Sequence, residues 1–413
     1  MIESTHTIKR TTFAAIAPLF LVLFIDGMGL SLLFPVLNSI IVDPHSDFLA
    51  TSVFDSTRDL LYGVTVGIFM ICWFFGAAFL GDLSDMIGRK KALMICLMGS
   101  FLGYLLSAFA VLAHSLLFLI IGRVVAGFTA GSQPIAQAAI VDISEPEHKA
   151  RNIGLILLAL SLGFVFGPII GGVLSDSQLI RWLNFSTPLY FASLISLLNA
   201  ILLWWLFQET FYRTGKIRIK LHHAIHIFIS AFQHKKVRNL SLVFLVMIFG
   251  WSNFFTFVPM FALKRYEFTP LMVSLLLADM GIGFSIGCGF LVDFFANRFS
   301  MKYVVVTSFF LASLVMFIPV LTHHPIYLWL MMAPVGVIIA VGYSTILTLF
   351  SNQVTEDEQG WVMGVTGSIM ALCFGLTSFF TGYLANYSVS LPMYLGAGGI
   401  GASALIMLLV CEK

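Results

Sequence analysis

Long apolar runs alternate with short polar stretches along the whole chain. Most of the runs are roughly 20 residues long or longer, which is the length that an α-helix needs to cross the hydrocarbon core of a bilayer. The pattern predicts twelve spanning helices, at 13–37, 62–81, 92–112, 116–140, 153–174, 188–207, 239–262, 271–291, 303–321, 326–350, 361–385 and 391–411. An even number of spans places both ends of the chain on the same side of the membrane.

The composition agrees with a membrane protein. Of the 413 residues, 59% are hydrophobic and 10% are charged, whereas soluble domains are about half apolar and about a quarter charged. The first apolar run is too long for a signal-peptide core, and no small-residue cleavage pattern closes it, so we expect it to be the first span. The net charge of +2 gives no indication of a nucleic-acid partner. The spacing of the cysteines and histidines indicates neither a metal nor another cofactor.

The basic residues predict how the chain is oriented. If the N-terminus lies in the cytoplasm, most of the 22 Lys and Arg residues fall in cytoplasmic segments. The outer loops then hold only Arg58, Arg181, Lys264 and Arg265, and Arg123 lies within a span. Cytoplasmic loops of membrane proteins carry an excess of Lys and Arg. We therefore expect a multi-pass protein of the cell inner membrane with both termini in the cytoplasm.

The longest polar stretch, 208–238, is rich in Lys, Arg and His and divides the chain into two parts. Some of its apolar side chains fall on one helical face, namely Leu221, Ile225, Phe228, Ile229 and Phe232. This spacing predicts an amphipathic helix on the cytoplasmic surface. The expected organisation is a six-helix half at 1–207, a linker at 208–238 and a second six-helix half at 239–413.

A short charged stretch occurs once in each half. The sequences GDLSDMIGRK at 81–90 and GFLVDFFANR at 289–298 lie about half the chain apart, and each follows an apolar run. They share a glycine at the first position, an aspartate at the fifth and a basic residue at the tenth. Six spans per repeat is an even number, so the two halves have parallel topology and are related by an axis along the membrane normal.

The first copy resembles motif A of the major facilitator superfamily. The resemblance implies the major facilitator fold, which is an all-α membrane protein with twelve transmembrane helices in two six-helix halves. It also implies that the charged stretch holds the two halves together on the cytoplasmic rim while the outer side is open. An ordinary solvated loop is the alternative. The second copy is weaker, because Ala296 and Asn297 stand where the first has Gly88 and Arg89.

The residue types in this stretch have physical roles. Glycine allows close approach of the backbone, and Asp85 is an anion that can lie near a helix N-terminus. Arg89 can pair with a carboxylate at a neighbouring helix end, for which we expect Asp142. The full set of residues expected in this cytoplasmic latch is Gly81, Asp85, Gly88, Arg89, Lys90, Asp142, Asp293 and Arg298.

The fifth span contains LGFVFGPIIGG, with Gly163, Gly167 and Gly171 on one helical stripe, together with Pro168 and Gly172. Packing through small residues is common among membrane helices and is the plain explanation. The Gly-Pro-x-x-Gly-Gly ending also resembles motif C of the drug:proton antiporter branch. We expect the proline to bend the helix and the glycines to pack closely on a helix of the other half. The stretches IDGMGLSLLFPVLN at 25–38 and TEDEQGWVMG at 355–364 likewise resemble tetracycline-type exporters.

Three charged side chains, Asp26, Arg123 and Asp279, lie well inside predicted spans. Such residues usually line a cavity or form pairs, because an unpaired charge in the membrane costs several kcal/mol. The stretch LIIGRVVAGFTAG resembles motif B, whose arginine, here Arg123, is implicated in proton coupling. We expect Asp26 to be the main proton-coupling residue, with Arg123 and Asp279 as further candidates. The alternatives are a static Asp26–Arg123 pair and, for Asp279, a helix-to-helix hydrogen bond.

Polar side chains within the spans supply candidates for substrate contact, namely Gln133, Gln137, Asn253 and Tyr343. Ordinary hydrogen bonds between helices are the alternative for each. The sequence thus predicts a proton-coupled exporter of small amphipathic compounds that acts as a monomer and is not an enzyme. A transporter of a defined metabolite such as an amino acid or siderophore, importing or exporting, is the second hypothesis. A membrane receptor or enzyme is disfavoured, because the chain has no HExxH, GxSxG or Walker pattern.

Overall fold

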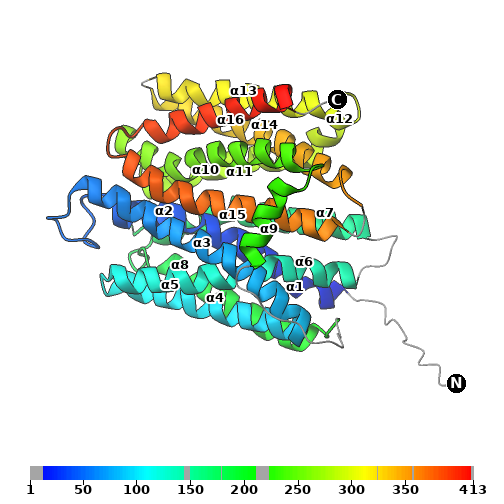
Figure 1. Ribbon diagram of the computed structural model, residues 1–413. Coiled ribbons are helices and arrows are strands. Elements are labelled where there is room, and N and C mark those ends of the chain that lie inside the picture. The colour runs from blue at the N-terminus through cyan, green and yellow to red at the C-terminus, as the bar shows by residue number, and fades with distance from the viewer. Residues whose placement is uncertain are drawn as a thin grey trace.

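The computed structural model describes residues 13–143, 149–177, 179–210, 223–322, 324–355 and 358–410. These residues contain twelve helices or helix combinations that are long and apolar enough to cross a membrane. The helices lie side by side in one bundle, with the first half of the chain on one side and the second half on the other (Figure 1). The predicted all-α class and the twelve spans are confirmed.

The first half consists of α1 (Phe13–Ser31), α2 (Leu33–Leu37), the π-helical turn η1 (Asn38–Val42), α3 (Asp55–Ile87), α4 (Arg89–Leu112), α5 (Leu116–Thr129), α6 (Ser132–Asp142), α7 (Lys149–Ser175) and α8 (Thr187–Leu206). The helix α9 (His223–Gln233) follows. The second half consists of α10 (Arg238–Tyr266), α11 (Pro270–Ile286), η2 (Gly287–Leu291), α12 (Val292–Ala296), α13 (Met301–Leu321), α14 (Pro325–Asn352), α15 (Gln359–Leu384) and α16 (Leu391–Val410).

Several helices extend beyond the apolar runs that predicted them. The clearest case is α3, which covers Asp55–Ile87 although its apolar run is only 62–81. A helix can continue into polar residues, because its backbone groups remain hydrogen-bonded there. Helix α3 ends where Gly88 follows it, and the φ of 96° at Gly88 is readily adopted only by glycine. The next helix, α4, begins immediately afterwards at Arg89.

The two halves contact each other mainly through α3 with α15 and through α7 with α11. In Figure 1, the orange α15 lies beside the blue α3. Glycines allow this close approach: a Cβ atom on Gly63 would lie 2.3 Å from the carbonyl oxygen of Ser378 and 3.0 Å from the Cα of Gly382. Backbones of the two halves therefore touch along this interface.

The fourth span is broken into α5 and α6 at Ala130 and Gly131. A Cβ atom on Gly131 would lie 2.6 Å from the carbonyl carbon of Gly76 on α3, so the break lies directly against another helix. Hydropathy does not reveal the break, because the apolar run continues through it. The consequence is that α6 has an N-terminus of its own inside the bundle.

The linker contains the predicted helix, although Leu221 and the rest of 211–222 lie outside the described residues. Helix α9 packs against α3, α10 and α15. The side chains that it buries are Ala224 and Ala231, whereas Ile225 and Ile229 are each 45% exposed. Phe228 and Phe232 of the expected apolar face are half-buried and pack against the core, so that face contacts the protein in part. We call the end of the bundle that holds α9 and Gly88 the linker side, and the opposite end, where α3 begins, the far side (Figure 1).

Candidate functional site

A cavity lies between the two halves. Its walls come from α3 and α7 of the first half and from α10, α11, α14 and α15 of the second. Methionine and aromatic side chains dominate the lining, among them Met70, Trp73, Trp251, Met280 and Phe374. The residues that line it carry no formal charge. Ligand pockets are usually lined mainly by apolar and aromatic side chains with a few polar groups.

Of the four predicted substrate contacts, only Tyr343 is among the residues that line this cavity. Asn253 is fully buried; it donates to the carbonyl of Phe249 at 2.7 Å and accepts a hydrogen bond from the Thr381 hydroxyl. That arrangement joins α10 to α15, as the hydrogen-bonding alternative expects. Gln133 and Gln137 lie on α6, outside the lining. No sequence signal distinguished the lining residues from the many other methionines and aromatics.

Asp26 lies on α1 beside the N-terminus of α6. The hydroxyl of Ser132, the first residue of α6, is 2.9 Å from Oδ1 of Asp26 and 2.7 Å from Oδ2. The free N–H groups and the dipole at a helix N-terminus favour an anion. The break in the fourth span therefore creates a polar site for this carboxylate within the bundle. Sequence analysis missed Ser132, because the two residues are distant in the chain.

Arg123 is 2% exposed on α5. Its Nε donates to the carbonyl oxygen of Thr65 at 3.4 Å, and its guanidinium lies 4.0 Å from the centre of the Phe69 ring. Stacking on an aromatic ring stabilises a buried guanidinium. Among the described residues, the salt bridges include none between Arg123 and Asp26. The structure thus differs from the static ion pair considered above.

Asp279 lies on α11, and its Oδ2 accepts a hydrogen bond from the backbone N–H of Ala333 on α14 at 3.1 Å. Ala333 precedes Pro334, which lies inside α14. Close packing of α11 and α14 supports this bond, because a Cβ atom on Gly336 would lie 2.1 Å from the carbonyl oxygen of Met280. The geometry is that of the helix-to-helix hydrogen bond considered above, and the structure does not bring Asp279 together with Asp26 or Arg123.

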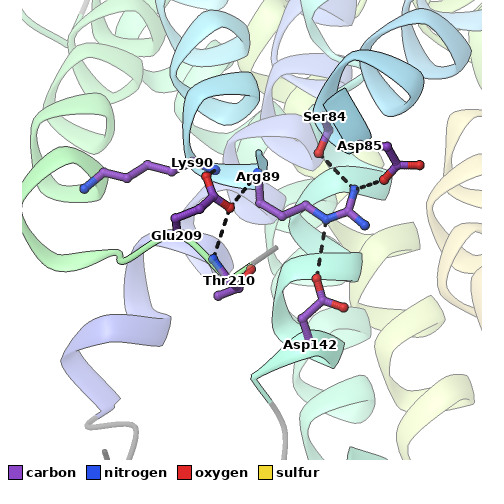
Figure 2. A network of polar contacts seen from close by, with 7 residues as sticks. All are labelled: Ser84, Asp85, Arg89, Lys90, Asp142, Glu209 and Thr210. Atoms are coloured by element: carbon purple, nitrogen blue, oxygen red, sulfur yellow. Dashed lines mark hydrogen bonds and ion pairs between the residues drawn. The ribbon is translucent and has the colours of Figure 1, made fainter. Parts of the chain in front are cut away.

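The charged stretch at 81–90 forms a compact polar cluster on the linker side, shown in Figure 2. Nη1 of Arg89 lies 2.8 Å from Oδ1 of Asp85 and 2.9 Å from the Ser84 hydroxyl. Nε of Arg89 lies 3.4 Å from Oδ2 of Asp142, the partner expected from the sequence. Asp85 itself lies in the last turn of α3 rather than at a helix N-terminus.

The anion at the start of α4 is instead Glu209, which the sequence analysis did not single out. Its carboxylate accepts from the backbone N–H of Arg89 at 2.8 Å and from that of Lys90 at 3.1 Å (Figure 2). A Cβ atom on Gly88 would lie 2.2 Å from Oε2 of Glu209, so glycine is needed here for space as well as for φ. Lys90 Nζ donates to the carbonyl of Trp204 at 2.7 Å.

The second copy of the stretch makes fewer contacts. Asp293 lies in the first turn of the short helix α12, and the Arg298 guanidinium lies 4.1 Å from the centre of the Phe294 ring. A Cβ atom on Gly289, or on Gly81 in the first copy, would meet nothing within 4 Å. Close packing therefore does not explain either of these two glycines in this conformation.

The glycine stripe of α7 packs on α1, within the first half. A Cβ atom on Gly163 would lie 2.4 Å from the carbonyl oxygen of Phe24, and one on Gly171 would lie 2.4 Å from that of Leu32. Gly167 lies against Ser31 in the same way. The expectation that these glycines pack on the other half is therefore wrong for all three.

Gly172 and Pro168 of the same motif face the second half. A Cβ atom on Gly172 would lie 2.2 Å from the hydroxyl oxygen of Ser274 on α11, so this glycine does allow close contact between the halves. Pro168 lies inside α7 and lines the cavity. The motif therefore contacts α1 with one face, and α11 and the cavity with another.

Comparison with known proteins agrees with this architecture. The sequence profile of the Major Facilitator Superfamily matches residues 19–377. The class C tetracycline resistance protein of Escherichia coli is 30% identical over 94% of this chain and 92% of its own. The quinolone resistance protein NorA of Staphylococcus aureus is 25% identical over 84% of this chain and 86% of its own.

Solved structures show the same fold. A D-xylose–proton symporter superposes with a TM-score of 0.76 at 16% identity, covering 97% of this chain and 98% of its own. A human organic anion transporter superposes with a TM-score of 0.72 at 19% identity, covering 96% and 99%. Together with the twelve spans and the matched profile, these findings show that the chain belongs to the Major Facilitator Superfamily of membrane transporters.

Proposed function

We propose that the protein is a proton-coupled exporter of small amphipathic compounds in the cell inner membrane, with its linker side and both termini in the cytoplasm. It acts as a monomer by alternating access, in which the two halves expose the central cavity first to one side and then to the other. The names of the tetracycline and quinolone resistance relatives support export of such compounds. The distribution of basic residues supports the orientation.

The observation that carries the proposal is the uncharged, methionine-rich and aromatic cavity between the halves. Flexible methionine side chains adapt to ligands of different shape, and aromatic rings stack on flat apolar ones. A zwitterionic metabolite such as an amino acid would need charged or strongly polar partners in its site. The lining therefore favours amphipathic compounds over the second hypothesis.

Asp26 is the proposed coupling group. Its carboxylate accepts the Ser132 hydroxyl at the N-terminus of α6, and this contact is stronger when the acceptor is charged. Protonation removes the charge and with it this attraction between α1 and α6. A protonation change at Asp26 therefore alters how two helices of the first half contact each other, which is the kind of change that coupling requires.

Transport in proteoliposomes with an imposed pH gradient tests the proposal. A panel of amphipathic aromatic compounds is screened first, and failure of the pH gradient to drive any of them would contradict proton-coupled export. The variant Asp26→Asn keeps the size and hydrogen bonding of the side chain but cannot titrate. It should lose uphill transport and retain downhill exchange. If it still concentrates substrate, Asp26 is not the coupling group and Asp279 is the next candidate.

A further inference from the structure

Side chains of the first half contact α10 of the second half at three places on the far side. Nδ2 of Asn38 donates to the carbonyl of Pro259 at 3.1 Å, and the Tyr62 hydroxyl donates to the carbonyl of Thr256 at 2.7 Å. In the third contact, Nζ of Lys264 lies 2.6 Å from Oδ2 of Asp59 and also donates to Oδ1. The third contact is an ion pair between helices of different halves, α3 and α10.

The ion pair lies between the cavity and the far end of the bundle. Along α10, the cavity residue Phe255 directly precedes Thr256, and Lys264 follows two turns later. Along α3, Asp59 comes before the cavity residues Met70 and Trp73. The contacts between the halves therefore begin next to the cavity at Thr256 and extend to the ion pair, which lies about two to three helical turns beyond the cavity residues. We propose that Asp59 and Lys264 form a far-side gate, a pair of positioning residues that must separate before the cavity can open to that side.

The burial of the two charges makes this pair suited to a gate. The side chain of Asp59 is 3% exposed and that of Lys264 is 20% exposed. A buried charge without its partner is strongly unfavourable, whereas two charges that are both hydrated are not. The closed state, with both charges paired, and the open state, with both in water, are therefore favoured over partly open states. A gate of this kind has two stable positions.

The basic residues next to this pair, Arg58 and Arg265, make their described hydrogen bonds within their own halves. Arg58, next to Asp59, donates to the carbonyls of Ile41, Asp43 and Ala50, all in the first half. Arg265, next to Lys264, donates to Ser390 and to the carbonyl of Thr322, both in the second half. Arg265 is thus a matched control for Lys264, since it is an adjacent cation on the same helix with contacts in its own half.

The gate rests on the proposed alternating access, but its test needs neither a substrate nor a proton gradient. Spin labels at the exposed far-side positions Thr57 and Asn386, in a cysteine-free background, report the distance between the halves. Lys264→Met and Asp59→Asn should each raise the ratio of long to short distances by about tenfold or more. Arg265→Met, and Lys264→Arg, which keeps the cation, should leave the ratio unchanged.

The double variant Asp59→Asn/Lys264→Met separates a gate from a general loss of structure. It leaves no charge buried alone, so the short distance should return in large part. Wild-type distances in both single variants would overturn the gate, as would equal opening in Arg265→Met. When the gate variants are introduced into the Asp26→Asn protein, they should change the ratio of long to short distances as they do in the wild type. A failure of proton coupling can therefore be told apart from a failure of the gate.

Discussion

On the far side, Lys264 reaches from the second half to Asp59 of the first, whereas on the linker side Arg89 binds Asp85 and Asp142 of its own half. Both sites combine a basic residue with carboxylates near helix ends, but among the ion pairs between described residues the far-side pair is the one that joins the halves. The difference shows which end of the interface is held closed by charge in this conformation. The two ion pairs of Arg89 that the structure describes both lie within the first half, so separating the halves at that end does not break them.

Reversing the charge at Lys264 should have the largest effect on the opening of the cavity to the far side. Lys264→Glu places a second carboxylate against buried Asp59, at a cost of about 3–5 kcal/mol to the closed state. A cysteine at Met247 in the cavity should then react with an impermeant thiol reagent added from the far side. Arg265→Glu is the control, because its contacts lie within the second half. Labelling no faster than in the parent would show that the two ends of the interface do not differ as described.

A smaller effect is expected from Gly88→Ala on the linker side. The backbone of Gly88, with φ 96° and ψ 156°, costs a non-glycine residue about 1–3 kcal/mol, and the new Cβ would displace the Glu209 carboxylate from the start of α4. Thermal unfolding in detergent should show a lower midpoint. The matched control is Gly81→Ala on α3. A Cβ atom there meets nothing within 4 Å, and alanine has a higher helix propensity than glycine. An equal loss in both variants would contradict this account of Gly88.

The smallest effect on this conformation is expected from Asp85→Asn. Arg89 keeps Ser84 and Asp142, and the Asp85 side chain is 35% exposed, so the lost pair costs about 0.5 kcal/mol. The polar cluster around Arg89 is expected to join the halves in the conformation that is open on the far side. In that case Asp85→Asn should lower turnover and lengthen the distances between labels at Lys91 and Gln353. Asp293→Asn, in the weaker second copy, is the comparison and should change less. Unchanged distances with normal transport would leave the stretch as an ordinary solvated loop.

Local patterns predicted the spans and one long-range contact. A spanning helix depends on its own run of apolar residues, so all twelve were found, and the helix ends were missed only where polar residues continue a helix, as in α3. The Arg89–Asp142 contact was expected, because the motif identified the arginine and the end of the fourth span offered a carboxylate. Both inferences rest on features visible within a few residues.

The remaining site residues depend on tertiary contacts that a single sequence does not show. Ser132 and Glu209 are ordinary polar residues until folding brings them to Asp26 and to the start of α4. The partner of the α7 glycines was predicted wrongly, because a glycine stripe shows that a helix packs closely but not on which neighbour. Lys264 did leave a signal, since it is one of the few basic residues that the charge distribution places on the outer side.

Helix α6 connects the two polar sites of the first half. Its first residue, Ser132, holds Asp26, and its last, Asp142, holds Arg89. The helix is 11 residues long, about 16 Å, and the break before it frees it from α5. A stiff rod fixed at both ends transmits displacement, so a shift of α6 away from Asp26 also moves Asp142 relative to Arg89. Thermodynamic reciprocity then requires that strengthening either contact changes the other by the same free energy.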